Sequence, residues 1–259
     1  TGRTLSTVDE LAISPTRITF DSAGTRMAAV DGKNLRVWDV QTGVELPSHL
    51  SGASAGANIA LSSNGSMIAF EQQQLGQSGC WVEVRDVSTG DYIRGFGDAD
   101  VPLTRRVSGM LRMAFSPDDR LLATIDHEGQ VRILDMEQDG SGLDSETPVV
   151  SQWNMDMDAI GRPQFIRFSP DGEMLFIATL SNVIRGWDVA SGEMIHDLKG
   201  QFERIRNMTI QADSSLMACS GYGSEVHVFD LMPERDLEEL LSNSSNFYSA
   251  HSISADGRQ

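Results

Sequence analysis

The chain has 259 residues, and 37 Asp and Glu residues against 20 Lys and Arg residues give it a formal net charge of −17. This acidity argues against a sequence-independent grip on nucleic acid and against an anionic membrane surface, because both need a basic face. Hydrophobic residues make up 40% of the chain, which is ordinary for a globular protein, and no apolar run is long enough to span a bilayer as a helix.

A short segment recurs six times along the chain, and we call its copies the anchors. Each anchor has a large apolar residue in third place and then a turn such as Ser-Pro-Asp-Gly, and successive anchors are 41, 54, 53, 42 and 43 residues apart. Such a period indicates a repeat architecture. The third residues of the anchors are Phe20, Leu61, Phe115, Phe168, Ile210 and Ile253.

A second landmark follows each of the first five anchors and ends in an Asp residue. The Asp lies 19, 25, 20, 20 and 20 residues after the third anchor residue, a spacing too regular for chance. We expect Trp38 and Trp187, which precede two of these Asp residues, to pack within the repeat. The landmark Asp residues are Asp39, Asp86, Asp135, Asp188 and Asp230.

Each repeat is predicted to form four short strands. Apolar and polar residues alternate around both landmarks, as they do in half-buried strands. Asp-Gly, Asn-Gly or Asp-Asp after the anchor supplies the residues that a tight hairpin needs, and Thr-Gly or Ser-Gly marks a turn after the landmark Asp. The strands are therefore the anchor strand, a strand like 27–30, the landmark strand and a closing strand like 194–198.

These features resemble those of the WD-repeat (WD40) family, most closely at residues 168–172, 37–40 and 186–189. The resemblance implies an all-β, WD40-like β-propeller of four-stranded antiparallel blades. Gln201 stands where the family often carries a His, and this departure keeps other propeller families open. We expect a single domain with repeats at about 12–50, 51–97, 98–153, 154–199 and 200–246. A partial sixth repeat at 247–259 predicts that the natural protein continues.

Three long insertions are predicted to lie at the same end of neighbouring blades, where long loops on a rigid scaffold commonly bind partners. They are residues 72–79, 97–108 and about 154–164, and a further insertion at 137–147 belongs to the opposite end and is expected to be a flexible loop. A hairpin predicted at the same end as the three insertions contains His127. The candidate partner-binding residues are Gln73, Asp98, Asp100, Arg105, Arg106, His127, Asp156 and Asp158.

The sequence predicts no catalytic residues, no metal site and no cofactor. Asn154, Asp156 and Asp158 have the spacing of calcium ligands, but the Gly and Glu that complete such a loop are absent, so a solvated acidic loop is expected. Cys80 and Cys219 are the only cysteines and are predicted to be two buried thiols, which favours a reducing, cytoplasmic location.

The favoured function is a non-catalytic scaffold that binds a protein or peptide on the end with the long loops. The acidic charge favours a basic partner. The alternative is a propeller enzyme or the propeller domain of an enzyme, of the lactonase-like or peptidase-associated kind. A structural domain in a larger signalling chain is a third possibility.

Overall fold

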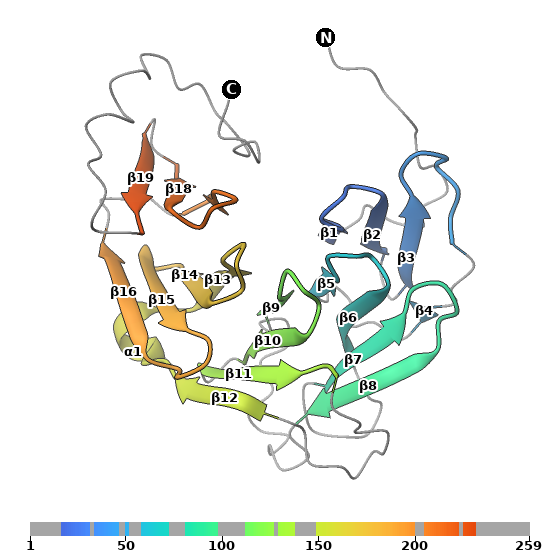
Figure 1. Ribbon diagram of the computed structural model, residues 1–259, viewed down its shortest axis with the longest axis horizontal. Coiled ribbons are helices and arrows are strands. Elements are labelled where there is room, and N and C mark those ends of the chain that lie inside the picture. Colours follow the sequence, from blue (N-terminus) through green and yellow to red (C-terminus); the bar gives the residue numbers. More distant parts are fainter. Residues whose placement is uncertain are drawn as a thin grey trace. The chain divides into compact units, whose positions relative to one another are not determined.

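The computed structural model describes residues 17–31, 34–46, 50–51, 58–72, 81–97, 112–126, 129–137, 149–199, 205–222 and 225–231. The chain divides into two compact units, Thr1–Gln152 and Trp153–Gln259, here called the N-terminal and the C-terminal unit. The described residues form five small antiparallel sheets (Figure 1). The fold is all-β, and these sheets are the blades of a β-propeller, which confirms the fold predicted from the repeat.

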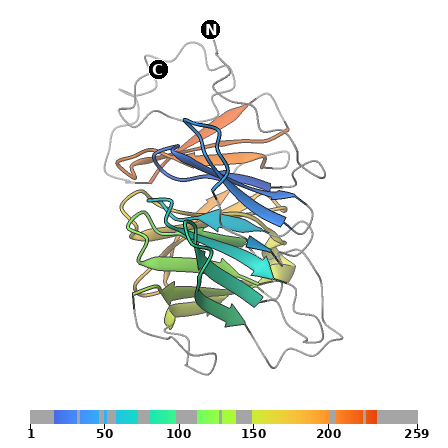
Figure 2. The same ribbon diagram turned by 90° about the vertical axis from the view of Figure 1, so that its right-hand side faces the viewer.

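Each blade places its strands side by side in chain order (Figures 1 and 2). The first strands are β1 (Arg17–Phe20), β5 (Ile59–Leu61), β9 (Arg112–Phe115), β13 (Pro163–Phe168) and β17 (Asn207–Ile210). The second strands are β2 (Arg26–Asp31), β6 (Met67–Gln72), β10 (Leu121–Ile125), β14 (Met174–Thr179) and β18 (Leu216–Ser220). The third strands are β3 (Asn34–Asp39), β7 (Trp81–Asp86), β11 (Gln130–Asp135), β15 (Val183–Asp188) and β19 (Val226–Asp230). The fourth strands are β4 (Leu50–Ser51), β8 (Tyr92–Gly97), β12 (Val149–Asn154) and β16 (Met194–Lys199).

The predicted four strands are thus present in the first four blades. The fourth strand of the fifth repeat and the partial sixth repeat lie outside the described residues. One element was not predicted: the connection expected at 154–164 contains a single helical turn, α1 (Met157–Ile160). Asp156 caps this turn, because its Oδ1 accepts a hydrogen bond from the Ala159 amide at 3.1 Å.

The turn between the first and second strands has the same geometry in every blade. Its fourth residue has a positive φ and donates its amide to the carbonyl of the turn's first residue. Glycine adopts this conformation without strain, whereas Asp119 at φ 63° and Ser214 at φ 59° adopt it at some cost. In these five turns, the residues with positive φ are Gly24, Gly65, Asp119, Gly172 and Ser214.

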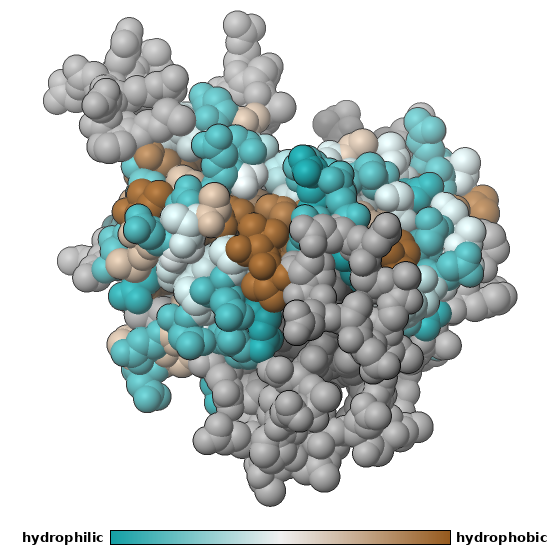
Figure 3. Space-filling model, turned by 60° about the horizontal axis from the view of Figure 1, so that its bottom comes forward, coloured by the Kyte–Doolittle hydropathy of each residue, from teal (hydrophilic) through white to brown (hydrophobic). Residues whose placement is uncertain are grey.

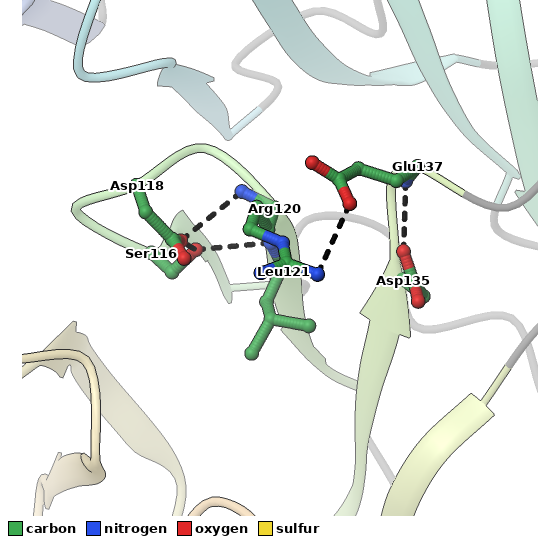
Figure 4. A network of polar contacts seen from close by, with 6 residues as sticks. All are labelled: Ser116, Asp118, Arg120, Leu121, Asp135 and Glu137. Atoms are coloured by element: carbon green, nitrogen blue, oxygen red, sulfur yellow. Dashed lines mark hydrogen bonds and ion pairs between the residues drawn. The ribbon is translucent and has the colours of Figure 1, made fainter.

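Side chains hold this turn closed, as the third blade shows (Figure 4). Ser116 Oγ accepts a hydrogen bond from the Leu121 amide at 2.9 Å, and Asp118 Oδ1 accepts one from the Arg120 amide at 3.1 Å. Arg120 also pairs with Glu137 at 3.1 Å, but both side chains are exposed, so this ion pair adds little stability. The serine and aspartate of the Ser-Pro-Asp motif therefore serve the turn.

The same turns join neighbouring blades within each unit. These bonds, which we call seams, connect the first turns of successive repeats, either between backbones or through a side chain. They run from Ser22 N to the Ser63 carbonyl at 3.0 Å, from Asn64 N to Asp119 Oδ2 at 2.9 Å, and from Asp171 N to Ser214 Oγ at 3.3 Å.

Apolar strand residues fill the cores of the blades, and the second strands β10 and β14 are buried at consecutive positions. At one register position, four blades place an Ala of the second strand opposite a Val or Ile of the third, namely Ala28–Val37, Ala69–Val84, Ala123–Ile133 and Ala218–Val228. The fourth blade reverses the sizes, with Phe176 opposite Gly186. The Phe176 ring is fully buried and stacks on His196 of β16, the residue that pairs with Gly186, at 5.9 Å between centroids. The glycine therefore provides the space that the phenylalanine fills.

The residues that are coloured in Figure 3 are mostly hydrophilic, with separate hydrophobic patches between them. The first blade differs from the others at its anchor. Phe20 is 52% exposed, whereas the equivalent Phe115 and Phe168 are 8% exposed. Ile18 is 56% exposed, whereas the equivalent Met113 and Ile166 are 7% exposed. The first strand of this blade therefore contributes less to the core than its counterparts do.

Candidate functional site

Two of the long connections leave the blades at the same end, which we call the insertion end. It is the end at which the first strand begins and the second strand stops. The connections 73–80, between β6 and β7, and 98–111, between β8 and β9, both belong to it. Six of the predicted partner-binding residues lie outside the described residues, namely Gln73, Asp98, Asp100, Arg105, Arg106 and His127.

Three polar side chains at the insertion ends of the N-terminal unit meet at one atom. Arg17 Nε lies 3.4 Å from Asn58 Oδ1, and a terminal guanidinium nitrogen of Arg112 donates to the same oxygen at 2.9 Å. The three residues come from three different blades, and each immediately precedes the first residue of an anchor. The repeat therefore places equivalent positions side by side.

The burial of these three side chains differs. Asn58 is 6% exposed, Arg112 is partly buried and Arg17 is exposed. The Nδ2 atom of Asn58 is buried and makes no hydrogen bond within the described part of the chain. Two donors that converge on one oxygen fix the orientation of the amide, since the opposite orientation would place Nδ2 against both guanidinium groups. The amide therefore presents its oxygen to the arginines and keeps an unused donor.

The charges of this cluster perturb one another. Burial lowers the pKa of Arg112, and the positive charge of Arg17 lowers it further, while the negative charge of Glu71 opposes the shift. Glu71 is 4% exposed, and its backbone amide donates to the Asn58 carbonyl at 3.3 Å. The cluster of Arg17, Asn58, Glu71 and Arg112 thus carries two positive charges and one negative charge at a partly buried site. Attraction to an added anion is screened less there than at an open surface.

The C-terminal unit carries two groups of polar residues at its insertion ends. Asp156 and Asp158, the two predicted binding residues that are described, are exposed on and beside α1, and Asp156 is engaged as its cap. Arg206, just before β17, donates to the Tyr222 hydroxyl at 3.1 Å and lies 4.1 Å from the ring centroid. Tyr222 is 57% exposed, so this pair presents an aromatic and a cationic surface together.

The landmark Asp residues stabilise turns. Asp39 Oδ1 accepts from the amide and the hydroxyl of Thr42, and Asp188 Oδ1 accepts from the amide and the hydroxyl of Ser191, all at 2.7–2.8 Å. Asp86 accepts from the Thr89 amide at 2.8 Å. These hydrogen bonds lower the pKa of all three carboxyl groups. Asp135 Oδ1 likewise accepts from a backbone amide, that of the residue two places on, at 2.8 Å, and Asp230 ends β19.

The two landmark tryptophans are both buried, at 3% exposed for Trp38 and 5% for Trp187. The guanidinium carbon of Arg36 lies 5.2 Å from the Trp38 ring. Trp153 of β12 stacks on Trp187 with centroids 5.8 Å apart, although its indole Nε1 is buried without a hydrogen bond to the described residues. Trp38 thus packs against a guanidinium group, and Trp187 packs against another indole ring.

Cys219 is a free thiol and 1% exposed, and burial raises its pKa to about 12. Cys80 lies outside the described residues. Burial also lowers the pKa of His196, which makes the neutral imidazole the favoured form beside Phe176. Over the described ranges, no three His, Cys, Asp or Glu side chains are grouped as a metal site would need.

Sequence reasoning missed the cluster of Arg17, Asn58, Glu71 and Arg112. The signal was present, since two arginines and an asparagine occupy the same place in three successive repeats. No family model matches the chain, and no curated protein matches it either. Among the described helices, none has the length and apolar character needed to cross a membrane.

Proposed function

We propose that this chain is a non-catalytic scaffold of the WD-repeat type, which binds a protein or peptide partner at the insertion ends of its blades. The observation that carries the proposal is that polar groups serve different purposes at the landmark positions and at the insertion ends. The landmark carboxylates Asp39, Asp86 and Asp188 are ionised acceptors inside turns. The insertion ends instead gather charged and aromatic groups that can contact a partner, such as Arg17 and the Arg206–Tyr222 pair.

The blades supply the rigidity that a docking surface needs. Strand registers within blades and seams between them hold the starts of β1, β5 and β9 in fixed positions inside the N-terminal unit. Binding residues on such a scaffold lose little conformational entropy on association. The net charge of −17 attracts a basic partner at long range, and Asp158 adds to this charge at an insertion end.

Capture of a partner from a native extract tests this proposal. Residues 98–111 are replaced by a Gly-Ser linker of equal length in one variant, and residues 138–148 are replaced in the same way in a control. Both segments belong to the N-terminal unit, but they lie at opposite ends of the blades. We expect the first variant to lose the captured protein and the control to retain it. If the variant at 98–111 still captured the partner and the variant at 138–148 did not, binding would lie at the opposite end of the blades and the proposal would be wrong.

A second measurement separates the scaffold from the alternative enzyme. A lactonase-like propeller gathers metal ligands, so a stoichiometric divalent metal in the intact natural protein would contradict the proposal. We also propose a reducing, cytoplasmic location, which the free buried thiol of Cys219 supports. Fractionation of the source cells with detection of the native protein tests the location.

A further inference from the structure

We propose that Arg17, Asn58 and Arg112 form a binding site for one carboxylate group. In the cell this group would come from the partner that docks on the insertion ends, so its source rests on the proposed function, whereas the site itself does not. The first argument is the convergence of donors. Two guanidinium groups reach the same oxygen of the buried Asn58 amide. The amide thus holds two cationic donor groups within one small region.

The second argument is the charge. Two guanidinium groups and the Glu71 carboxylate leave one positive charge, which one carboxylate neutralises. A phosphate dianion would leave excess negative charge beside Glu71, which is 4% exposed and therefore poorly screened. The planar fork of an arginine also matches a carboxylate with two parallel hydrogen bonds. The site therefore favours a carboxylate over a phosphate.

The third argument is the pattern of exposure. Arg17 is exposed and can turn toward a ligand, while Arg112 is partly buried and Asn58 is 6% exposed. A ligand would reach the exposed arginine first and then gain the less screened attraction of the buried one. Burial and the neighbouring arginine both lower the pKa of Arg112, and an anion placed between the two guanidinium groups relieves the second of these effects.

The test uses the whole chain and three simple salts. Sodium acetate, sodium chloride and sodium phosphate are added at matched ionic strength, and the side-chain Nε–Hε signals of the arginines are followed by NMR. We expect acetate to shift the signals of Arg17 and Arg112 in a saturable way, with a dissociation constant in the millimolar range. Chloride should cause no saturable shift. An equal response to chloride, no response to acetate, or tighter binding of phosphate would each overturn the carboxylate assignment.

Variants connect the response to these residues. Arg17→Gln is expected to weaken acetate binding at least tenfold, and it alters an exposed side chain that the fold tolerates. Asn58→Asp places a carboxylate between the two arginines and should abolish acetate binding while the chain stays folded. Arg36→Gln is the matched control, because Arg36 is also a strand arginine of the first blade but pairs with Glu45. Equal loss of binding in the control and in Arg17→Gln would refute the site.

Two further probes identify the source of the carboxylate. A blocked pentapeptide with one central Glu among glycines is compared with the same peptide carrying Gln. Tighter binding of the Glu peptide than of free acetate supports a partner side chain, and equal binding of the Glu and Gln peptides contradicts it. Acetate binding requires no partner, so its failure refutes the site alone. Failure of the loop-replacement capture refutes the proposed function alone.

Discussion

Phe176 and Gly186 form a large–small pair where the other blades have a small residue opposite a β-branched one. This reversal predicts that substitutions at the two positions are strongly coupled in their effect on stability. A Cβ atom on Gly186 would lie 2.6 Å from Phe176 Cε1 and 3.2 Å from the Cβ of His196, so Gly186→Val alone must displace a buried ring. Phe176→Ala alone leaves the ring's volume empty. The double variant places Ala opposite Val, the pair that the first, second and fifth blades use. We therefore expect the second change to rescue the first.

The magnitudes follow from the burial of the ring. Phe176 is 0% exposed, and truncating such a phenylalanine to alanine costs about 3–5 kcal/mol. Overpacking by Gly186→Val costs about 1–3 kcal/mol. A swap that conserves volume usually costs less than about 1.5 kcal/mol. The double variant should thus be more stable than the Phe176→Ala variant, with a coupling energy of at least about 2.5 kcal/mol.

Urea unfolding followed by tryptophan fluorescence measures these free energies, and hydrogen exchange of peptides from β14–β16 locates the effect. The control joins Phe176→Ala with Leu122→Ala, a buried change in the other unit. Those two losses should add to within about 0.5 kcal/mol. A double variant at Phe176 and Gly186 that is as unstable as the sum of its single variants would refute the argument from volume.

Three further predictions concern turns and the thiol. Asp119→Ala should destabilise the chain by about 1.5–3 kcal/mol, because two backbone amides lose a charged acceptor. Asp119→Gly should cost less, because glycine relieves the strain of the positive φ. Urea unfolding of the two variants compares these losses of stability. The Thr89 amide lowers the pKa of Asp86 and the Ser191 amide that of Asp188, so their stabilisation is complete well above pH 3.8 and is lost as the pH falls through the lowered values. Unfolding measured from pH 6 to pH 2 should show this loss, and Asp188→Asn should reduce it; a loss that begins near neutral pH would contradict the assignment. Cys219 should react with iodoacetamide at least about 100-fold more slowly in the native chain than in urea, as read by mass spectrometry of its peptide, because burial suppresses the thiolate.

Sequence reasoning predicted the blades because the repeat carries its own register. The apolar anchor, the turn and the landmark Asp recur at fixed spacings, and alternation along landmark strands such as β11 assigns their buried face. The single turn of α1 was missed because four residues are too few to show a helical period. Asp156 followed by Met157 was the available cue, since Asp is a preferred N-cap residue.

The reversed pair of the fourth blade could not be predicted in the same way. Gly186 occupies a place that the landmark pattern fills with a β-branched residue elsewhere, and only the pairing of strands shows that Phe176 compensates for it. Prediction of the arginine cluster required still more structural information. Arg17 and Arg112 are 95 positions apart in the chain, and the repeat spacing alone does not say how far a side chain reaches between blades. Geometry between repeats, rather than within them, was the missing information.

The seams between blades explain where this chain tolerates changes of length. In all five described repeats, the second strand begins six residues after the third anchor residue, as from Phe20 to Arg26 and from Phe168 to Met174. The extra residues of the longer repeats all fall in other connections. An inserted residue in the first hairpin would displace one turn from its bonds with the next blade, and the misalignment would pass to both neighbours. A whole repeat can be gained or lost without that penalty, so the blade is the unit by which this architecture can grow.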